Sequence, residues 1–446
     1  MNTENNVATA ARQMEPIEFG NLLINFTTEF NRIWDSRGSG SKPASFWRPT
    51  PAPDLLPGYF PLGDIAIPGY GNINGNTIVA VVCEGVPKDG DTSIGKALCP
   101  PDDFERVWRD SGSGAAADCT IWRPVPPAGY VALGLVCSNG RDKPLSNTVR
   151  CVRADLVVAS HISNRIWSDS GSGASQDFSA WAIAPPSAAA GEIYLSPGTF
   201  VGANSHTRPA TDDAAYSLRA RIPLQVDAAP EAPSLSSFEP PAPEEMAKIT
   251  HTARLPWFAV KDPQLTPLEQ FHASAFYRLE RSDRYVLVGH GHNTSIANRN
   301  YRWTAPRLQT IESLEAFTNV TTIRVVTEWP LYVSNPEHLF QLMNASIRFS
   351  ARLSNDFTHT QASPNGWLNS AAVEVISRVE KNKSVVAYLM QSDYRLLRED
   401  GTQVASDIRY TDTDSLHFSE YPPEKNSEVL SPNPMTEPPV ATDTAP

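Results

Sequence analysis

The chain has 446 residues, 41% of them hydrophobic, with 49 Asp plus Glu against 37 Lys plus Arg, a formal net charge of −12 and 39 Pro. This length and hydrophobic content predict two or three domains with buried cores and exclude a wholly disordered chain. The acidic balance, without a Lys/Arg-rich run, argues against a nucleic-acid partner held by counterion release. Proline this frequent disfavours long helices, so we expect an all-β fold.

Residues 1–18 are predicted to be an N-terminal tail. They are polar and lack the basic and apolar regions of a secretion signal, and no stretch of the sequence reaches 18 apolar residues. We therefore expect a protein made in the cytoplasm without a signal peptide, with release to act outside the cell as an open alternative. The five cysteines include no CxxC pair, which favours reduced, buried thiols over a disulfide framework or a zinc site. They are Cys83, Cys99, Cys119, Cys137 and Cys151.

Residues 19–226 contain three copies of one unit, each with a Trp, a Gly-Ser-Gly turn and a second Trp. The first tryptophans are Trp34, Trp108 and Trp167, and the turns begin at Gly38, Gly112 and Gly171. Around these motifs the sequence alternates in short β-type runs separated by Pro-rich corners, about four strands per unit. Since a single small sheet buries little, we expect the three units to pack around a common axis with their aromatic faces together. The third copy is the most divergent, which suggests a terminal or specialised unit.

The second copy, from Trp108 to Val136, resembles the family described as vacuolar protein sorting-associated protein 62. Its distinctive run is Gly-Ser-Gly-Ala, then Asp, Ile-Trp-Arg-Pro and Pro-Pro-Ala-Gly-Tyr-Val-Ala-Leu-Gly-Leu-Val. The resemblance extends over about residues 19–223 and implies a three-fold β-prism-like domain. Modules of this kind occur as lectins and as receptor-binding domains of pore-forming toxins, but a shared fold is a weak argument for a shared function.

The Gly-Ser-Gly turns are the candidate ligand-binding sites, and two interpretations of them stay open. A small-residue turn beside a Trp and two Asp could bind sugar hydroxyls, with the ring stacking on a pyranose, or could hold calcium. Alternatively, Gly supplies the left-handed backbone of a tight turn, and the tryptophans form the core of each sheet. The first copy weakens a shared site, because Asp35 sits one place earlier there and the second Asp is missing. The candidates are Trp34, Gly38, Trp108, Asp110, Gly112, Asp118, Trp167, Asp169, Gly171 and Asp177.

Residues 227–245 are predicted to be a linker, because they hold five Pro, five acidic residues and no basic one. Residues 246–421 show repeated β-type alternation and are predicted to form a second all-β domain. The Asp400-Gly401 dipeptide indicates a hairpin turn in that domain. Residues 422–446 are predicted to be a disordered, Pro-rich tail.

One run of the second half, residues 346–354, is strongly amphipathic. The side chains that share its apolar face are Ile347, Phe349, Ala351 and Leu353. The simpler interpretation is an ordinary half-solvated strand, and the alternative is a strand of a hairpin that inserts into a membrane, where apolar and polar residues must alternate in this way. The end of the domain, residues 420–423, resembles the end of the insertion module of aerolysin-like toxins.

Motifs for catalysis or cofactors are lacking in the sequence. It contains no GxSxG, GxxxxGK[ST] or HExxH motif, so we predict no catalytic residue, cofactor or bound metal. The pair His290 and His292 has no nearby Cys or carboxylate to complete a ligand set and is interpreted as part of a solvated turn. A carbohydrate-active enzyme would need two carboxylates facing each other across a cleft, and nothing in the sequence suggests such a pair.

These observations favour a non-enzymatic protein with two parts. We hypothesise an insecticidal or defensive toxin component, in which the prism-like domain recognises a glycan or cell-surface receptor and the second domain acts on a membrane or in assembly. A partner toxin subunit is a further expected partner, and nucleic acid is not. The alternative is an intracellular scaffold of the vacuolar-sorting type without toxin activity.

Overall fold

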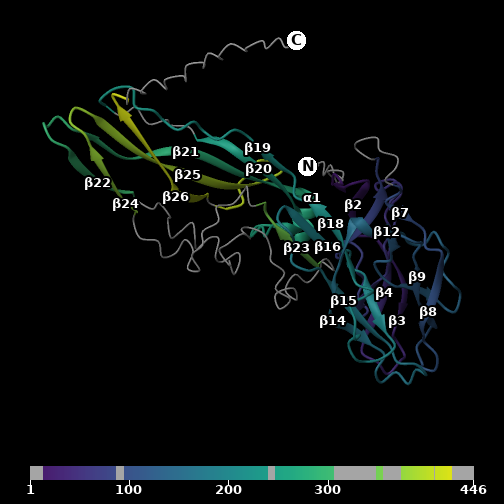
Figure 1. Ribbon diagram of the computed structural model, residues 1–446. Helices are drawn as coiled ribbons and strands as arrows, with labels where there is room; N and C mark the ends of the chain where they lie inside the picture. The colour runs from purple at the N-terminus through teal and green to yellow at the C-terminus, as the bar shows by residue number, and fades with distance from the viewer. Residues whose placement is uncertain are drawn as a thin grey trace, which may run out of the picture.

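The computed structural model describes residues 14–86, 95–239, 247–305, 348–354, 373–405 and 407–423. Figure 1 shows an N-terminal domain of short strands at one end and a long sheet that extends away from it. Within the described ranges the only α-helix is α1 (Pro267–Ala273), which begins with a Thr266–Glu269 capping box. No described helix has the length and apolar content that crossing a membrane would require. The fold is all-β, as the sequence predicts.

Three antiparallel sheets of three strands carry the repeated motif, one for each copy. In every sheet the strand with the second Trp lies in the middle, and a bulge precedes the first Trp of its neighbour. The first sheet contains β3 (Phe30–Asp35), β4 (Ala44–Pro49) and β5 (Ile65–Pro68). The second contains β8 (Asp103–Arg109), β9 (Cys119–Val125) and β11 (Val136–Asn139). The third contains β14 (His161–Ser168), β15 (Ser179–Ala184) and β17 (Phe200–Ala203).

A second tier of sheets lies between these three and the long sheet (Figure 1). Its first sheet contains β1 (Ile17–Phe19), β2 (Leu22–Thr27) and β6 (Val79–Glu84). Its second contains β7 (Leu98–Cys99), β10 (Tyr130–Val131) and β12 (Cys151–Arg153). Its third contains β13 (Val157–Ala159), β16 (Glu192–Ser196) and β18 (Tyr216–Arg221), together with β23 (Arg348–Arg352). The last strand comes from the second half of the chain and pairs with β16.

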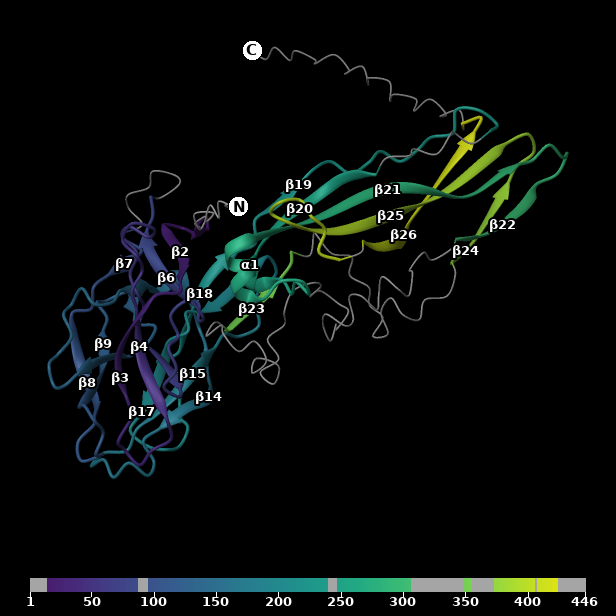
Figure 2. The same cartoon turned by 180° about the vertical axis from the view of Figure 1, so that it is seen from behind.

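The long sheet has five antiparallel strands in the order β19-β20-β21-β25-β26. They are β19 (Leu224–Val226), β20 (Lys248–Pro256), β21 (Phe276–His292), β25 (Ser384–Arg398) and β26 (Ile408–Tyr421). With 17 residues, β21 extends about 55 Å at the usual rise per residue. A two-stranded ribbon of β22 (Arg299–Ala305) and β24 (Val373–Val379) lies at the far end (Figure 2). The predicted Asp400-Gly401 turn follows β25, with Gly401 at a φ of 84°.

One interpretation of the second half is wrong. His290 and His292 lie on strand β21 rather than in a solvated turn, and the ring of His292 stacks on Phe238 at 4.8 Å. The described part of the Pro-rich linker contacts the long sheet. Leu235 is buried against Val386 and Tyr388 of the long sheet, and its backbone N–H donates to Ser419 Oγ at 2.8 Å. A few apolar side chains are enough to fix an extended, Pro-rich segment onto a sheet.

A common core joins the two halves. It contains Phe26 of β2, in edge-to-face contact with Trp257 and Phe258 at 5.6 Å each, and Phe258 contacts Phe349 of β23 at 5.3 Å. These four side chains come from the N-terminal domain, the long-sheet part and strand β23, so the cluster is shared between the two halves. Aromatic contacts of this kind dominate core energetics. We call this cluster the junction core.

Candidate functional site

The first tryptophans of the three copies meet on the axis of the N-terminal domain. The ring centroids of Trp34, Trp108 and Trp167 lie 5.9–6.2 Å apart in edge-to-face geometry. Each indole Nε1 donates to a backbone carbonyl of another copy: Trp34 to Ala117, Trp108 to Gln176 and Trp167 to Lys42, at 2.7–2.8 Å. All three side chains are at most 4% exposed. They leave no ring face for a sugar to stack on, so they form a core.

The three Gly-Ser-Gly turns, residues 38–40, 112–114 and 171–173, also meet at the axis. We call them the apical turns, since their sheets point away from the long sheet (Figure 1). Gly38 has a φ of 88°, and a β-carbon there would lie 2.7 Å from the carbonyl oxygen of Gly114. A β-carbon on Gly40 would overlap the carbonyl oxygen of Gly171. Glycine is therefore required both by conformation and by the close approach of neighbouring backbones.

The candidate aspartates lie around the apical turns, but their surroundings differ between copies. In the second copy Asp110 is 3% exposed, and Asp118 forms an ion pair with Arg141 at 3.7 Å. Burial, together with the neighbouring carboxylates of Asp118 and Asp169, raises the pKa of Asp110. In the first copy Ser36 takes the place of Asp110 and lies 3.3 Å from the Tyr70 hydroxyl. A shared ligand geometry is absent from these two described copies, as the sequence of the first copy already indicates.

In the third copy the two aspartates meet a histidine. The backbone N–H of Phe178 donates to Asp169 Oδ1 at 2.9 Å, and His206 Nε2 lies 2.6 Å from the same oxygen. His206 Nε2 is 3.7 Å from Asp177 Oδ1. In the described chain, Asp169, Asp177 and His206 are the group whose ligand atoms could hold a metal, all within 4.8 Å of one another. The repeated motif does not reveal His206, because this residue lies 37 positions after Asp169, outside the motif.

The predicted amphipathic strand lies at the edge of the N-terminal domain. As β23 it pairs with β16 from Glu192↔Arg352 to Ser196↔Arg348. Three members of its apolar face, Phe349, Ala351 and Leu353, are at most 6% exposed and belong to the junction core. Ile347 lies outside the described residues. The other face of β23, with Arg348, Ser350 and Arg352, is half-exposed, as expected of a half-solvated strand, and its partner is β16 rather than a strand of the long sheet.

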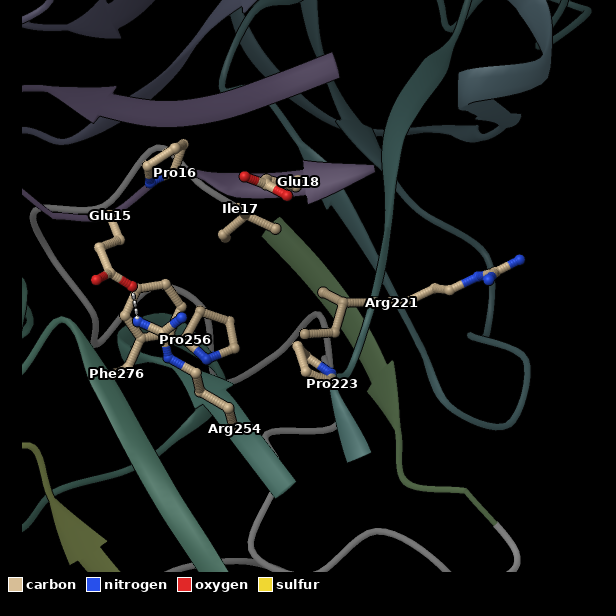
Figure 3. A pocket seen from close by; sticks show the side chains of 10 residues that line it. Glu15, Pro16, Ile17, Glu18, Arg221, Pro223, Arg254, Pro256 and Phe276 are labelled. Atoms are coloured by element: carbon tan, nitrogen blue, oxygen red, sulfur yellow. Dashed lines mark hydrogen bonds and ion pairs between the residues drawn. The ribbon is translucent and has the colours of Figure 1, made fainter. Parts of the chain in front are cut away.

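A cleft of about 360 Å³ lies between the two halves, beside the junction core. Figure 3 shows the Glu15 carboxylate facing Arg254, which lies against the ring of Phe276, while Arg221 points away. Arg254 Nη2 lies 2.5 Å from Glu15 Oε2, and the Arg254 guanidinium carbon lies 3.6 Å from the centroid of the Phe276 ring. Because Arg254 holds Glu15 in an ion pair, the arrangement is typical of a contact between domains.

Two carboxylates at the last two strands are held in ion pairs on the sheet surface. Arg409 bonds Asp393 at 2.6 Å, and Arg395 bonds Asp407 at 2.9 Å. These pairs cross between β25 and β26 or the turn that joins them. Each of the two carboxylates therefore has an arginine as its partner.

Comparison with known proteins places the first half of the chain. The family described as vacuolar protein sorting-associated protein 62 matches residues 7–236. The crystal structure of GNIP1Aa from Chromobacterium piscinae is 24% identical with a TM-score of 0.37, over 45% of this chain and 37% of that chain. The crystal structure of Cry35Ab1 is 10% identical with a TM-score of 0.31, over 73% of this chain and 89% of that chain. The chain thus matches little more than a third of GNIP1Aa. None of the curated proteins matches it.

Proposed function

The chain belongs to the vacuolar protein sorting-associated protein 62 family, and we propose that this member is a non-enzymatic, toxin-type protein. The N-terminal domain would bind a glycan or receptor on a cell surface, and the second half would act on the membrane through the part of the chain that contains β23. In this proposal the protein acts outside the cell that makes it, whether alone or with a partner subunit.

The observation that carries the proposal is the position of β23. It lies in the connection between the two ribbon strands β22 and β24, yet it pairs with β16 of the N-terminal domain. Its apolar face is buried in the junction core, and its other face carries Arg348, Ser350 and Arg352. The apolar and polar residues of β23 alternate, and the strand is held by non-local pairing with β16. Such a strand is suited to separating from β16 and pairing with another strand.

The energetics of β23 allow it both to stay paired with β16 in water and to separate from β16 at a membrane. Burying a large apolar side chain such as Phe349 or Leu353 contributes about 1.5–3 kcal/mol. The strand also covers the edge of β16, whose unpaired backbone groups would otherwise be open to association. Release therefore costs several kcal/mol in water. A bilayer offsets part of that cost, since it accepts the same apolar face while the polar face points to a lumen.

The exposed parts of the apex favour recognition by the N-terminal domain. The tryptophans are buried, so recognition would fall to the polar groups around the apical turns. Asp118, Arg141 and Asp177 each have more than half of their side chain exposed. Charged and amide groups on turns that rest on a rigid core are suited to binding sugar hydroxyls or a polar receptor surface.

Dye release from vesicles tests the proposal. The full chain is added to phosphatidylcholine vesicles with and without glycosphingolipids in the outer leaflet, and its binding to a glycan array is measured in parallel. We expect selective glycan binding and faster dye release from the vesicles that carry the recognised glycolipid.

If the protein shows no glycan binding and causes no dye release on any surface tried, the proposal is refuted. A protein partner captured from cell extracts, with no effect on vesicles, would instead support the intracellular scaffold. Hydrolysis of the arrayed glycans would indicate an enzyme and would contradict the non-enzymatic part of the proposal.

A further inference from the structure

The third apical turn assembles three metal-type ligands from two loops, the β14–β15 connection and the loop after β17. Asp169 follows β14, Asp177 precedes β15, and His206 follows β17. Asp169 is 3% exposed and is fixed by the Phe178 N–H, whereas His206 and Asp177 have exposed fractions of 33% and 62%. One ligand is therefore positioned rigidly from inside the domain, and two can adjust at the surface.

The other two copies show why this set is specific to the third. The second copy keeps both aspartates, but its third group is Arg141, whose guanidinium has no lone pair to offer a metal. The first copy has hydroxyls at the matching places, Ser36 and Tyr70. Only the third copy combines two carboxylates with a side chain that can itself be a ligand.

One oxygen of the buried carboxylate Asp110, near this set, lacks a hydrogen-bond partner in the described part of the chain. Asp110 is 3% exposed, and within the described residues its Oδ1 makes no hydrogen bond. It interacts electrostatically with Asp169, one of the three ligands. An unsatisfied, buried carboxylate oxygen is costly unless positive charge lies near it. A cation bound beside Asp169 would supply such positive charge.

We infer that Asp169, Asp177 and His206 form a binding site for a divalent transition-metal ion, with Zn²⁺ as the representative ion. Two carboxylate oxygens and one imidazole nitrogen suit Zn²⁺ or Mn²⁺, whereas Ca²⁺ takes oxygen ligands. Three protein ligands leave a coordination position for a group from outside. The ion would link the third apical turn to the loop after β17 and so brace the exposed end of the N-terminal domain.

Titration calorimetry with the full chain, stripped with EDTA and dialysed, tests the site. ZnCl₂ is titrated into the wild type and into the ligand variants His206→Ala and Asp177→Asn. Two matched controls are Asp118→Asn, the same position in the second copy, and His161→Ala, an exposed histidine beside Asp212. We expect one equivalent of tight binding, at least tenfold weaker in both ligand variants and unchanged in both controls. Zinc should raise the melting temperature of the wild type and controls more than that of the ligand variants.

The inference is overturned if the wild type binds neither Zn²⁺ nor Mn²⁺ stoichiometrically. It is also overturned if His206→Ala binds zinc as the wild type does, because the ion would then be held at a site that does not include His206. Circular dichroism of the EDTA-treated variants separates loss of the ligand from loss of the fold. The test involves no membrane or glycan, so its outcome is independent of the proposed function.

Discussion

Among single residues, glycines determine how the apical turns pack. At these positions, backbone atoms of another copy lie where a β-carbon would be. Gly40 shows this most directly, because the backbone of Gly171 fills the space that a β-carbon would need. Neither backbone can move freely, since Ala116 N donates to Arg37 O and Ser175 N donates to Ser111 O across the neighbouring turns. The glycines thus allow three turns to close on one axis.

We expect Gly40→Ala to destabilise the protein by about 1–3 kcal/mol, because overpacking against backbone cannot be relieved by a side-chain rotation. The measurement is the free energy of unfolding from urea titration. Gly71→Ala is the control, since Gly71 has nothing within 4 Å of a β-carbon. Equal stability of the two variants would contradict the close approach of the turns.

A second residue-scale feature is the buried ion pair of Asp262 with Arg398. Arg398 donates to both carboxylate oxygens, at 2.6 and 2.8 Å. Burial opposes ionisation of Asp262, but Arg398, Gln264 N–H and the Tyr277 hydroxyl together hold its pKa below the ordinary value. The pair fixes the end of β25 to the segment before α1.

This lowered pKa makes Asp262 stabilising at neutral pH and less so in acid. The unfolded chain takes up a proton at this residue near the ordinary Asp pKa of about 3.9, so the contribution is present above that pH and is lost as the pH falls through the lower pKa of the folded state. We expect Asp262→Asn to cost about 3 kcal/mol at pH 7 and clearly less at pH 3. Urea unfolding at both pH values checks this, with exposed Asp54→Asn as control. A difference that does not shrink in acid would contradict the assignment.

At the scale of elements, the decisive pairing is that of β23 with β16. The two strands are far apart in the sequence, as the hydrogen bond from Ala188 N to Ser350 Oγ across 162 positions shows. The alternation of residues 346–354 predicts a strand with one apolar face, and this strand exists. What the alternation cannot give is its partner, because period-two patterning specifies which face is buried and not against what.

We expect Phe349→Ala to loosen β23 before the rest of the molecule. Truncating a buried Phe costs about 3–5 kcal/mol, and the contact with Phe258 is one that holds the strand to the junction core. Hydrogen–deuterium exchange of residues 348–352 should accelerate, while exchange in β21 and β25 stays as in the wild type. Ile376→Ala, at a position 54% exposed on β24, is the control. Unchanged exchange in β23 would show that Phe349 does not retain it.

The candidate site divides in the same way between local and non-local information. The Trp spacing predicts a repeated core, and the apical aspartates are visible within the repeated motif. Arg141 and His206 lie in loops outside the repeated motif. Each comes beside the aspartates of its own copy because β11 pairs with β9 and β17 pairs with β15, and this non-local pairing is not visible in the motif. The docking of Phe238 on His292 likewise depends on a contact that no local pattern specifies.

In the molecule as a whole, the two halves share one core. The junction core draws Phe26, Trp257, Phe258 and Phe349 from three separate stretches of the chain. The sequence divides at its Pro-rich linker, but the structure does not divide there, because β19 of the long sheet precedes the linker and β23 returns across it. Amino-acid composition indicates where a linker lies, but it does not show which residues on the two sides of the linker pack together.

This organisation predicts a single thermal transition in scanning calorimetry, because the junction core is shared by both halves. The ratio of calorimetric to van't Hoff enthalpy should be close to one. Two transitions at well separated temperatures would mean that the halves are independent and that the junction core contributes little.

In the proposed function, membrane action requires β23 to leave β16. Tyr194 and Ser350 are direct cross-strand partners on the face away from the core, and paired positions of this kind fit disulfide geometry. We therefore specify the double variant Tyr194→Cys/Ser350→Cys, with each single variant as control for the five native free cysteines. Dye release from glycolipid-bearing vesicles is measured before and after dithiothreitol. The account predicts no release from the oxidised double variant and wild-type release once it is reduced; release that is equally fast in the oxidised form would contradict it.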